Sequence, residues 1–185
     1  MRRDDLDAFA DWGRHDDPLF RHYDPRALDA VEADDLWRFL AGSPRSRLPY
    51  VGLAEGRVVA SLLVRNIDRA AGTGEIGIVL DPHRVGRGLG RRILERFAEV
   101  LAAEGFRRLV LDVMGYNGRA IAAYRAAGFE VAAERWDDPE PGIDLGALLA
   151  GTAAERLLPH VRIEDGRYRA RVVRMHRRLE LTTKD

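Results

Sequence analysis

Residues 85–90 read VGRGLG, and the segments on either side show what this short stretch does. Before it, GEIGIVLDP (74–82) is rich in β-branched residues and ends at a proline, which is typical of a strand. After it, apolar residues recur at helical spacing until Gly105. A strand, a glycine-rich turn and a helix predict an anion site, because unpaired N–H groups and the helix dipole meet at the helix N-terminus. Four arginines surround that end of the helix: Arg84, Arg87, Arg91 and Arg92.

The glycine turn does not match the common nucleotide motifs. Its G-x-G-x-G spacing differs from the G-x-G-x-x-G of a dinucleotide site. It also lacks the G-K-[ST] ending of a triphosphate loop, and the only lysine in the chain is Lys184. Since such a turn is often only a tight connection, the rest of the chain has to identify the ligand.

Composition limits the possible classes of protein. A chain of 185 residues that is 46% hydrophobic predicts a single domain over residues 1–185. Thirty basic and thirty acidic residues cancel, which argues against nucleic acid or membrane as the main partner. The absence of cysteine and of paired histidines predicts no metal site. Because we find no signal peptide and no long apolar run, we expect a cytoplasmic protein.

The hydrophobic pattern predicts one mixed α/β domain. In chain order, the expected elements are helices 4–13 and 27–40, a hairpin from Tyr50 with its turn at Glu55-Gly56, strand 74–82, helix 89–105, strand 107–114, helix 117–127, strand 129–136, an added segment at about 137–166 with a helix from Leu145 to about Leu158, and a last strand 167–180.

A second motif follows the glycine turn by about thirty residues, where 117–131 read NGRAIAAYRAAGFEV. Asn117 is a good N-cap residue, and Tyr124 lies seven residues further on, two turns along the same helix face. Both side chains can therefore point toward one edge of the sheet.

Together, VGRGLG and the later N-x-x-A-x-x-x-Y-x-x-x-G-F resemble the GCN5-related N-acetyltransferase (GNAT) superfamily of acetyl-CoA-dependent acyltransferases. The resemblance covers about residues 50–131 and, more loosely, the flanking segments. It implies an α/β fold with a central mixed, mostly antiparallel sheet flanked by helices, here with an extra helix inserted before the last strand. It also implies acetyl-CoA as co-substrate.

The resemblance carries cofactor-binding roles to particular residues. The pyrophosphate loop of the family matches Val85, Gly86, Arg87, Gly88, Leu89, Gly90 and Arg91, its pantetheine-pairing strand matches Ile78, Val79 and Leu80, and its cofactor contacts from the next helix match Asn117 and Tyr124. Val85 stands where the family often has arginine or glutamine, which leaves the backbone amides of 86–91 as the main binders. The chain also lacks a clear counterpart of the family's first strand.

These residue types suit acetyl transfer to an amine. The Leu80 amide can stabilise the negative charge that develops on the thioester oxygen. Tyr124, the general acid of the family, can protonate the departing thiolate. Glu75 is the best candidate base for the amine. Without cysteine to carry an acyl group, direct attack in a ternary complex is expected.

Plainer interpretations stay open at this point. Tyr124 can be a packing residue, Glu75 an ordinary strand-end carboxylate and Asn117 only an N-cap. The whole chain can be a non-catalytic CoA-binding sensor or structural module. Nucleic-acid binding through the arginines of 167–178 is a further alternative, although a solvated strand face explains them more simply.

The acceptor is expected to be a small-molecule amine or a peptide. Asp16, Asp17, Phe20 and Tyr23 are candidates to line its site, and a packed loop explains them equally well. The leucines of the added segment form an apolar stripe that has to be buried. The stripe can cover the acceptor site or form a homodimer interface, with a slight preference for the interface.

Overall fold

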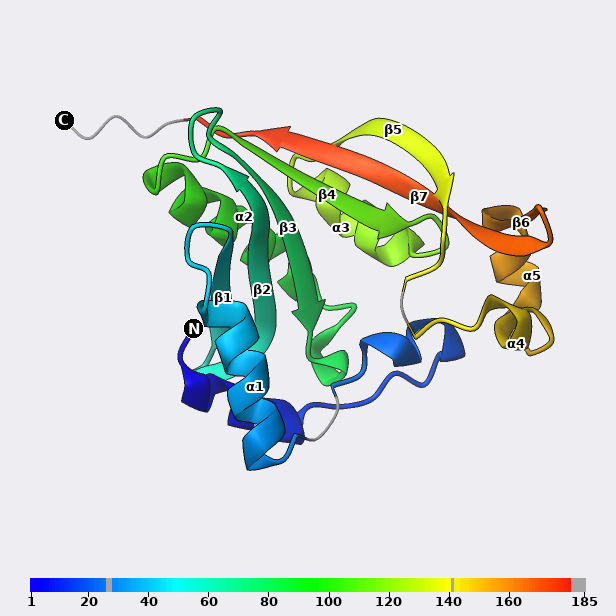
Figure 1. Cartoon of the computed structure of the whole chain (residues 1–185), viewed down its shortest axis with the longest axis horizontal. Coiled ribbons are helices and arrows are strands. Elements are labelled where there is room, and N and C mark those ends of the chain that lie inside the picture. Colours follow the sequence, from blue (N-terminus) through cyan, green and yellow to red (C-terminus); the bar gives the residue numbers. More distant parts are fainter. Residues whose placement is uncertain (26–27, 141, 181–185) are drawn as a thin grey trace.

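The computed structural model describes residues 1–25, 28–140 and 142–180 (Figure 1). Its centre is a seven-stranded sheet with strand order β1-β2-β3-β4-β7-β5, and β6 pairs with β7. Among the described residues only β3 and β4 pair in parallel, so the predicted mixed, mostly antiparallel sheet is confirmed. The strands are β1 (Arg47–Ala54), β2 (Arg57–Asp68), β3 (Thr73–Leu80), β4 (Arg108–Met114), β5 (Glu130–Asp137), β6 (Val161–Glu164) and β7 (Arg167–Arg178).

Helices flank both faces of this sheet. Helices α2 (Leu89–Ala103) and α3 (Gly118–Ala126) lie behind it in Figure 1, whereas α1 (Ala30–Ala41) lies in front of β1 and β2. The short 3₁₀ helices are η1 (Arg3–Asp11), η2 (Pro18–Tyr23), η3 (Pro82–Arg84) and η4 (Leu158–His160). No helix in these described ranges is both long and apolar enough to cross a membrane.

Several predicted boundaries need correction. The helix expected at 4–13 is the 3₁₀ helix η1, and the hairpin begins at Arg47 rather than Tyr50. The helix expected at 27–40 begins at Ala30, because Asp29 and Glu32 form a reciprocal capping box; Ala27 lies outside the described residues.

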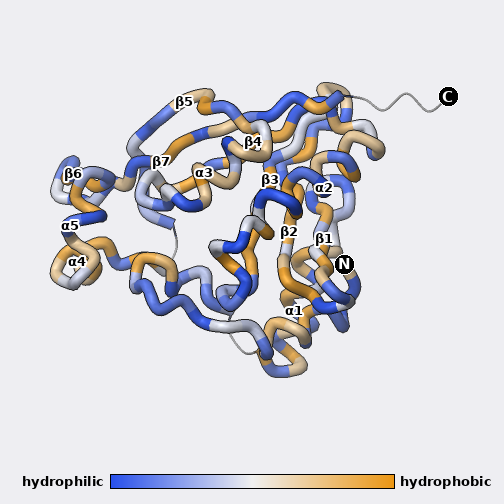
Figure 2. Tube along the Cα trace, turned by 180° about the vertical axis from the view of Figure 1, so that it is seen from behind, coloured by the Kyte–Doolittle hydropathy of each residue, from blue (hydrophilic) through white to orange (hydrophobic). Residues whose placement is uncertain are grey.

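The main cluster of buried side chains lies between the sheet and the pair α2 and α3. Leu94, Phe97 and Leu101 form one stripe of α2 and pack against the sheet. β2 supplies Leu62 and Val64, and its hydrophobic run appears as a largely orange tube in Figure 2. This cluster fixes the positions of β3, β4 and the two helices.

A second cluster forms where the N-terminal segment (residues 12–25) meets the inserted segment (about 137–166). Its buried members are Leu19, Phe20, Met114, Tyr116, Leu145, Ala153, Leu157, Ala170 and Val172. Leu148 and Leu149 pack against it as well. Most of the apolar stripe of the inserted segment is thus buried within the chain, and a dimer interface is not needed to explain that part; Leu158 is exposed.

The prediction of one inserted helix from Leu145 to Leu158 is wrong. The structure has two short helices, α4 (Leu145–Leu149) and α5 (Ala154–Leu157), separated by a turn at Gly151 and followed by η4 with Pro159. Strand β6 then pairs with β7 across an Asp165-Gly166 turn, in which both residues have positive φ. That dipeptide is a hairpin signal that the sequence offers just before the last strand.

Two adjacent leucines test how the inserted segment is held. Leu157 is 0% exposed in the second cluster, and Leu158 is 62% exposed. Leu157→Ala should lower the free energy of unfolding by about 2–5 kcal/mol through lost burial and a cavity. Leu158→Ala should change it by less than about 0.5 kcal/mol. Equal effects of the two substitutions in urea denaturation would contradict the described packing.

Candidate active site

The central feature of the site is the separation of β3 from β4. The two strands pair only at Thr73–Glu75 with Arg108–Val110. β3 then continues to Leu80 and β4 to Met114 without further pairing between them in the described part of the chain. β2 and β7 still pair with their outer edges, so an unpaired backbone edge opens in the middle of the sheet.

One hydrogen bond shows which β3 residues face this opening. The Asp81 N–H donates to the Val59 carbonyl of the neighbouring β2 segment at 3.0 Å. Both backbone groups of a strand residue point to the same edge, and the edge alternates from one residue to the next. The N–H and C=O groups of Ile78 and Leu80 therefore point away from β2, toward β4. Val79 turns its own toward β2. Of the three predicted strand residues, Ile78 and Leu80 therefore offer backbone groups to a ligand.

The glycine turn lies directly beyond this edge. Gly86 and Gly88 have φ values of 80° and 73°, and a Cβ on either would meet nothing within 4 Å. Gly88 is the N-cap of α2, so the first N–H groups of the helix border open space. At Gly90 a Cβ would come within 3.1 Å of the Leu80 side chain, which explains the third glycine by close packing of helix and strand.

The arginines around the turn differ in their partners. The Arg91 Nε donates to Glu95 at 2.7 Å, and an Arg84 nitrogen lies 4.0 Å from a Glu55 oxygen. Arg87 forms no ion pair with any described residue. Its charge and the α2 dipole together favour an anion at the turn.

Helix α3 brings Asn117 and Tyr124 to the same side of the sheet as α2. The Asn117 Oδ1 accepts from the Ala120 N–H at 3.1 Å, so Asn117 is an N-cap as its position suggested. Tyr124 is buried in the main cluster and packs edge-to-face with Phe129 at 5.8 Å between ring centroids. Burial, with a smaller contribution from Glu140, raises the pKa of Tyr124, so its phenol is protonated at neutral pH.

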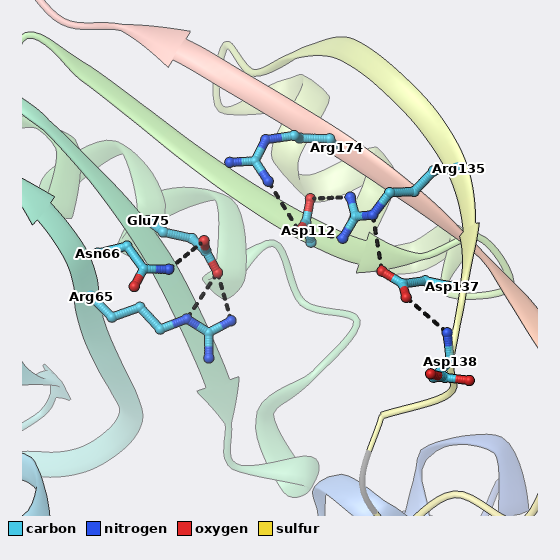
Figure 3. A network of polar contacts seen from close by, with 8 residues as sticks. All are labelled: Arg65, Asn66, Glu75, Asp112, Arg135, Asp137, Asp138 and Arg174. Carbon is cyan, nitrogen blue, oxygen red and sulfur yellow. Dashed lines mark hydrogen bonds and ion pairs between the residues drawn. The ribbon is translucent and has the colours of Figure 1, made fainter.

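Glu75 has partners that sequence reasoning missed (Figure 3). Its Oε1 accepts from Arg65 Nε and Nη2 at 2.8 and 2.6 Å, and its Oε2 accepts from Asn66 Nδ2 at 3.0 Å. Only the β2–β3 register, which places Arg65 opposite Glu75, could have indicated this pairing. Because Ile76 faces α2, the neighbouring Glu75 lies on the other face of the sheet from Tyr124.

A second polar network fixes the far half of the sheet (Figure 3). Asp112 of β4 accepts two hydrogen bonds from Arg135 of β5, at 3.1 and 2.8 Å, and one from Arg174 of β7 at 3.3 Å. Arg135 also donates to Asp137 at 3.1 Å and lowers the pKa of that carboxyl. These hydrogen bonds hold Asp137, the last residue of β5, in place where the following loop begins.

The N-terminal segment joins the two diverging halves. The Gly13 N–H donates to Asp81 Oδ1 at 3.0 Å, and a Cβ at Gly13 would lie 2.5 Å from the His83 ring. Further along, Asp17 accepts from Arg156 of α5 at 2.7 and 2.9 Å. The segment thus connects the end of β3 to the inserted segment.

The candidate acceptor residues of this segment have different surroundings. The Asp17 carboxylate accepts hydrogen bonds from Arg156 and from the Leu19 N–H, so it has a structural role. Phe20 belongs to the second cluster, 6.4 Å from the ring of Tyr116, and Tyr23 packs against the same cluster.

Comparison with known proteins identifies the class that this fold and site define. Residues 6–129 match the sequence profile of the acetyltransferase (GNAT) family. The chain belongs to this family, which confirms the predicted resemblance and the predicted class of enzyme.

Individual relatives show where the similarity lies. A mycothiol acetyltransferase from Beutenbergia cavernae is 43% identical over 76 residues, which is 40% of this chain and 25% of that protein. The chain therefore spans about a quarter of the length of that relative.

Solved structures share the fold. A spermidine N-acetyltransferase from Vibrio cholerae, in complex with CoA and spermine, has a TM-score of 0.66 at 15% identity over 97% of this chain and 92% of that one. A phosphinothricin acetyltransferase from Sinorhizobium meliloti, in complex with AcCoA, has a TM-score of 0.60 at 19% identity. The match covers 99% of this chain and 88% of that one.

The Glu75 pairing generates a prediction about stability. Arg65→Met leaves the buried Glu75 carboxylate with Asn66 as its remaining side-chain donor, and should lower the free energy of unfolding by about 1–3 kcal/mol. As control, Arg38→Met removes an exposed pair with Asp35 and should cost less than about 1 kcal/mol. If Arg65→Met is as stable as the wild type in thermal unfolding, Glu75 does not depend on Arg65.

Proposed function

We propose that this protein transfers an acetyl group from acetyl-CoA to a primary amine by direct attack in a ternary complex. The main support is the continuity of the unpaired β3 edge with the glycine turn. Ile78 and Leu80 offer backbone groups for the amides of pantetheine, and the N–H groups at the start of α2 suit the diphosphate. The two similar structures that contain CoA or AcCoA favour the same cofactor.

The reaction assigns a task to each group. The amine nitrogen forms a bond to the thioester carbon while the Leu80 N–H stabilises the carbonyl oxygen. As the carbon–sulfur bond breaks, Tyr124 supplies a proton to the thiolate. Glu75 is the candidate base; Arg65 and Asn66 occupy three of the roughly four acceptor positions of a carboxylate. One position on Oε2 is left to take the proton of the amine, through water.

The proposed reaction is tested by a screen of primary amines and peptide N-termini with acetyl-CoA. Release of free thiol that depends on the added amine would support it. Binding of CoA without thiol release for any amine would instead indicate a non-catalytic CoA-binding module.

Gly88 tests the cofactor position. Asp tolerates positive φ better than most residues and the space around Gly88 is open, so Gly88→Asp should fold normally. Its carboxylate would repel the diphosphate, and CoA affinity should fall on the order of 10-fold or more, seen as a smaller CoA-induced rise in melting temperature. Gly166→Asp is the matched control, with φ of 72° and open space around it. If CoA raises the melting temperature of Gly88→Asp as much as that of the wild type, the diphosphate does not bind at this turn.

Tyr124→Phe tests the general acid. The ring and its packing on Phe129 are kept, so melting temperature and CoA affinity should stay near the wild-type values. Turnover should fall by on the order of 10²–10⁴-fold because the proton donor is lost. Tyr50→Phe removes the hydroxyl that donates to Glu104 and should leave turnover unchanged. If Tyr124→Phe has the turnover of the wild type, Tyr124 is a packing residue and not the general acid.

A further inference from the structure

A cavity of about 330 Å³ lies where α3, β5 and β7 meet, at the end of the sheet away from β1 (Figure 1). Helix α3 contributes Gly118, Ile121, Ala122 and Arg125, which share one face of the helix at spacings of three and four residues. Tyr124 lies on a different face of α3. The described residues of β3 and of the glycine turn do not line the cavity. It is therefore separate from the proposed cofactor site.

Two side chains in the cavity wall carry buried polar atoms without a partner. Arg171 Nε, from β7, and His160 Nδ1, from η4, have no hydrogen-bond partner among the described residues. A Cβ at Gly115 would lie 2.7 Å from the Arg171 nitrogen and 2.9 Å from the His160 nitrogen, so the two atoms lie close together. Buried polar groups are normally paired, because leaving one unpaired is costly. One ligand group can reach both atoms.

The guanidinium of Arg171 is only partly used by the protein. Its Nη1 donates to Glu134 Oε2 at 3.5 Å, which is longer than an ordinary hydrogen bond, and the Glu134 side chain is half exposed. The Nε–H of an arginine and a neighbouring Nη–H point the same way and match two oxygens of a carboxylate or phosphate. The unpaired Nε edge of Arg171 therefore suits an oxyanion.

The charges in the cavity wall also favour an anion. Arg125 forms no ion pair with any described residue, so Arg125 and Arg171 together outweigh Glu134. Burial, and then the charge of Arg171, lower the pKa of His160. The imidazole is thus neutral at neutral pH, and it can donate a hydrogen bond from Nδ1.

The size and the apolar part of the cavity suit an organic molecule. Its volume is about ten times the roughly 30 Å³ that one water occupies in the liquid, and it falls at the small end of ligand pockets. Ile121, Ala122 and Val173 add apolar surface to the polar groups of the wall. A molecule with an apolar body and one oxyanion matches both kinds of surface.

We propose that this cavity binds the oxyanion group, a carboxylate or a phosphate, of a small organic molecule. The Nε edge of Arg171 holds the oxyanion, His160 donates to it from Nδ1, and the apolar side chains contact the body of the ligand. The inserted segment then has a role beyond packing, since it supplies His160. The inference does not depend on the proposed acetyl transfer, because none of the residues assigned to that reaction lines the cavity.

Calorimetric titration with three small probes tests this site. Benzoate and phenyl phosphate carry the two oxyanions on the same ring, and benzamide is a neutral molecule with the shape of benzoate. At least one of the two anions should bind about 10-fold or more tightly than benzamide, and the tighter anion distinguishes carboxylate from phosphate. If neither anion binds more tightly than benzamide, ordered water alone satisfies the unpaired atoms and the inference is wrong.

The titrations are repeated in the presence of saturating CoA to separate this site from the proposed cofactor site. The affinity for the tighter anion should stay the same, because the glycine turn does not line the cavity. Loss of anion binding in the presence of CoA would place the anion at the cofactor site and overturn the inference. Binding that persists supports it even if no thiol is ever released.

Two substitutions should change the anion affinity in opposite directions. Arg171→Met removes the donor edge and should weaken binding about 10-fold or more. Glu134→Gln removes the competing carboxylate and should strengthen binding about 2- to 5-fold. Because Glu134 is exposed, this second variant should fold normally and decides the question if Arg171→Met does not fold.

Arg178→Met is the matched control, because it removes one positive charge from an exposed position at the other end of β7. It should leave the anion affinity unchanged. Wild-type affinity in a folded Arg171→Met, an equal loss in Arg178→Met, or no gain in Glu134→Gln overturns the inference.

Discussion

The structure depends on how few residues join β3 to β4. After Glu75 and Val110 the parallel pairing stops, and backbone groups in the middle of a sheet are left without strand partners. Such an arrangement persists only if the surroundings hold the strands apart. Here α2 packs beneath β3 and α3 lies beneath β4, while β2 and β7 keep the outer edges paired. The unpaired β3 edge is the place where we propose that an extended ligand adds to the sheet.

The end of this opening is assembled from distant parts of the chain. Asp81 holds Gly13 at one side, and Arg156 holds Asp17 at the other. Between them the second cluster packs η2 against the inserted helices. The N-terminal and inserted segments therefore close this end of the opening, whereas the proposed cofactor site is built from one continuous strand, turn and helix.

This difference explains what could be predicted from the sequence. The glycine turn, α2 and the Asn117 cap follow local rules of backbone conformation and spacing, so residues 74–128 could be interpreted directly. The bonds of Glu75 to Arg65 and Asn66 depend on strand register, and the approach of Glu140 to His22 depends on the packing of segments far apart in sequence. Neither leaves a periodic signal. The inserted helix was misjudged because its leucine spacing continues across Gly151, where the helix ends.

The two apolar clusters have no buried residue in common. Substitutions at separate sites without shared partners change stability almost independently. Side chains of the second cluster can therefore be exchanged during evolution while the main cluster and the β3 edge keep their packing. The packing that holds the β3 edge and the packing that holds the inserted segment therefore contribute to stability separately, which allows one to change without loss of the other.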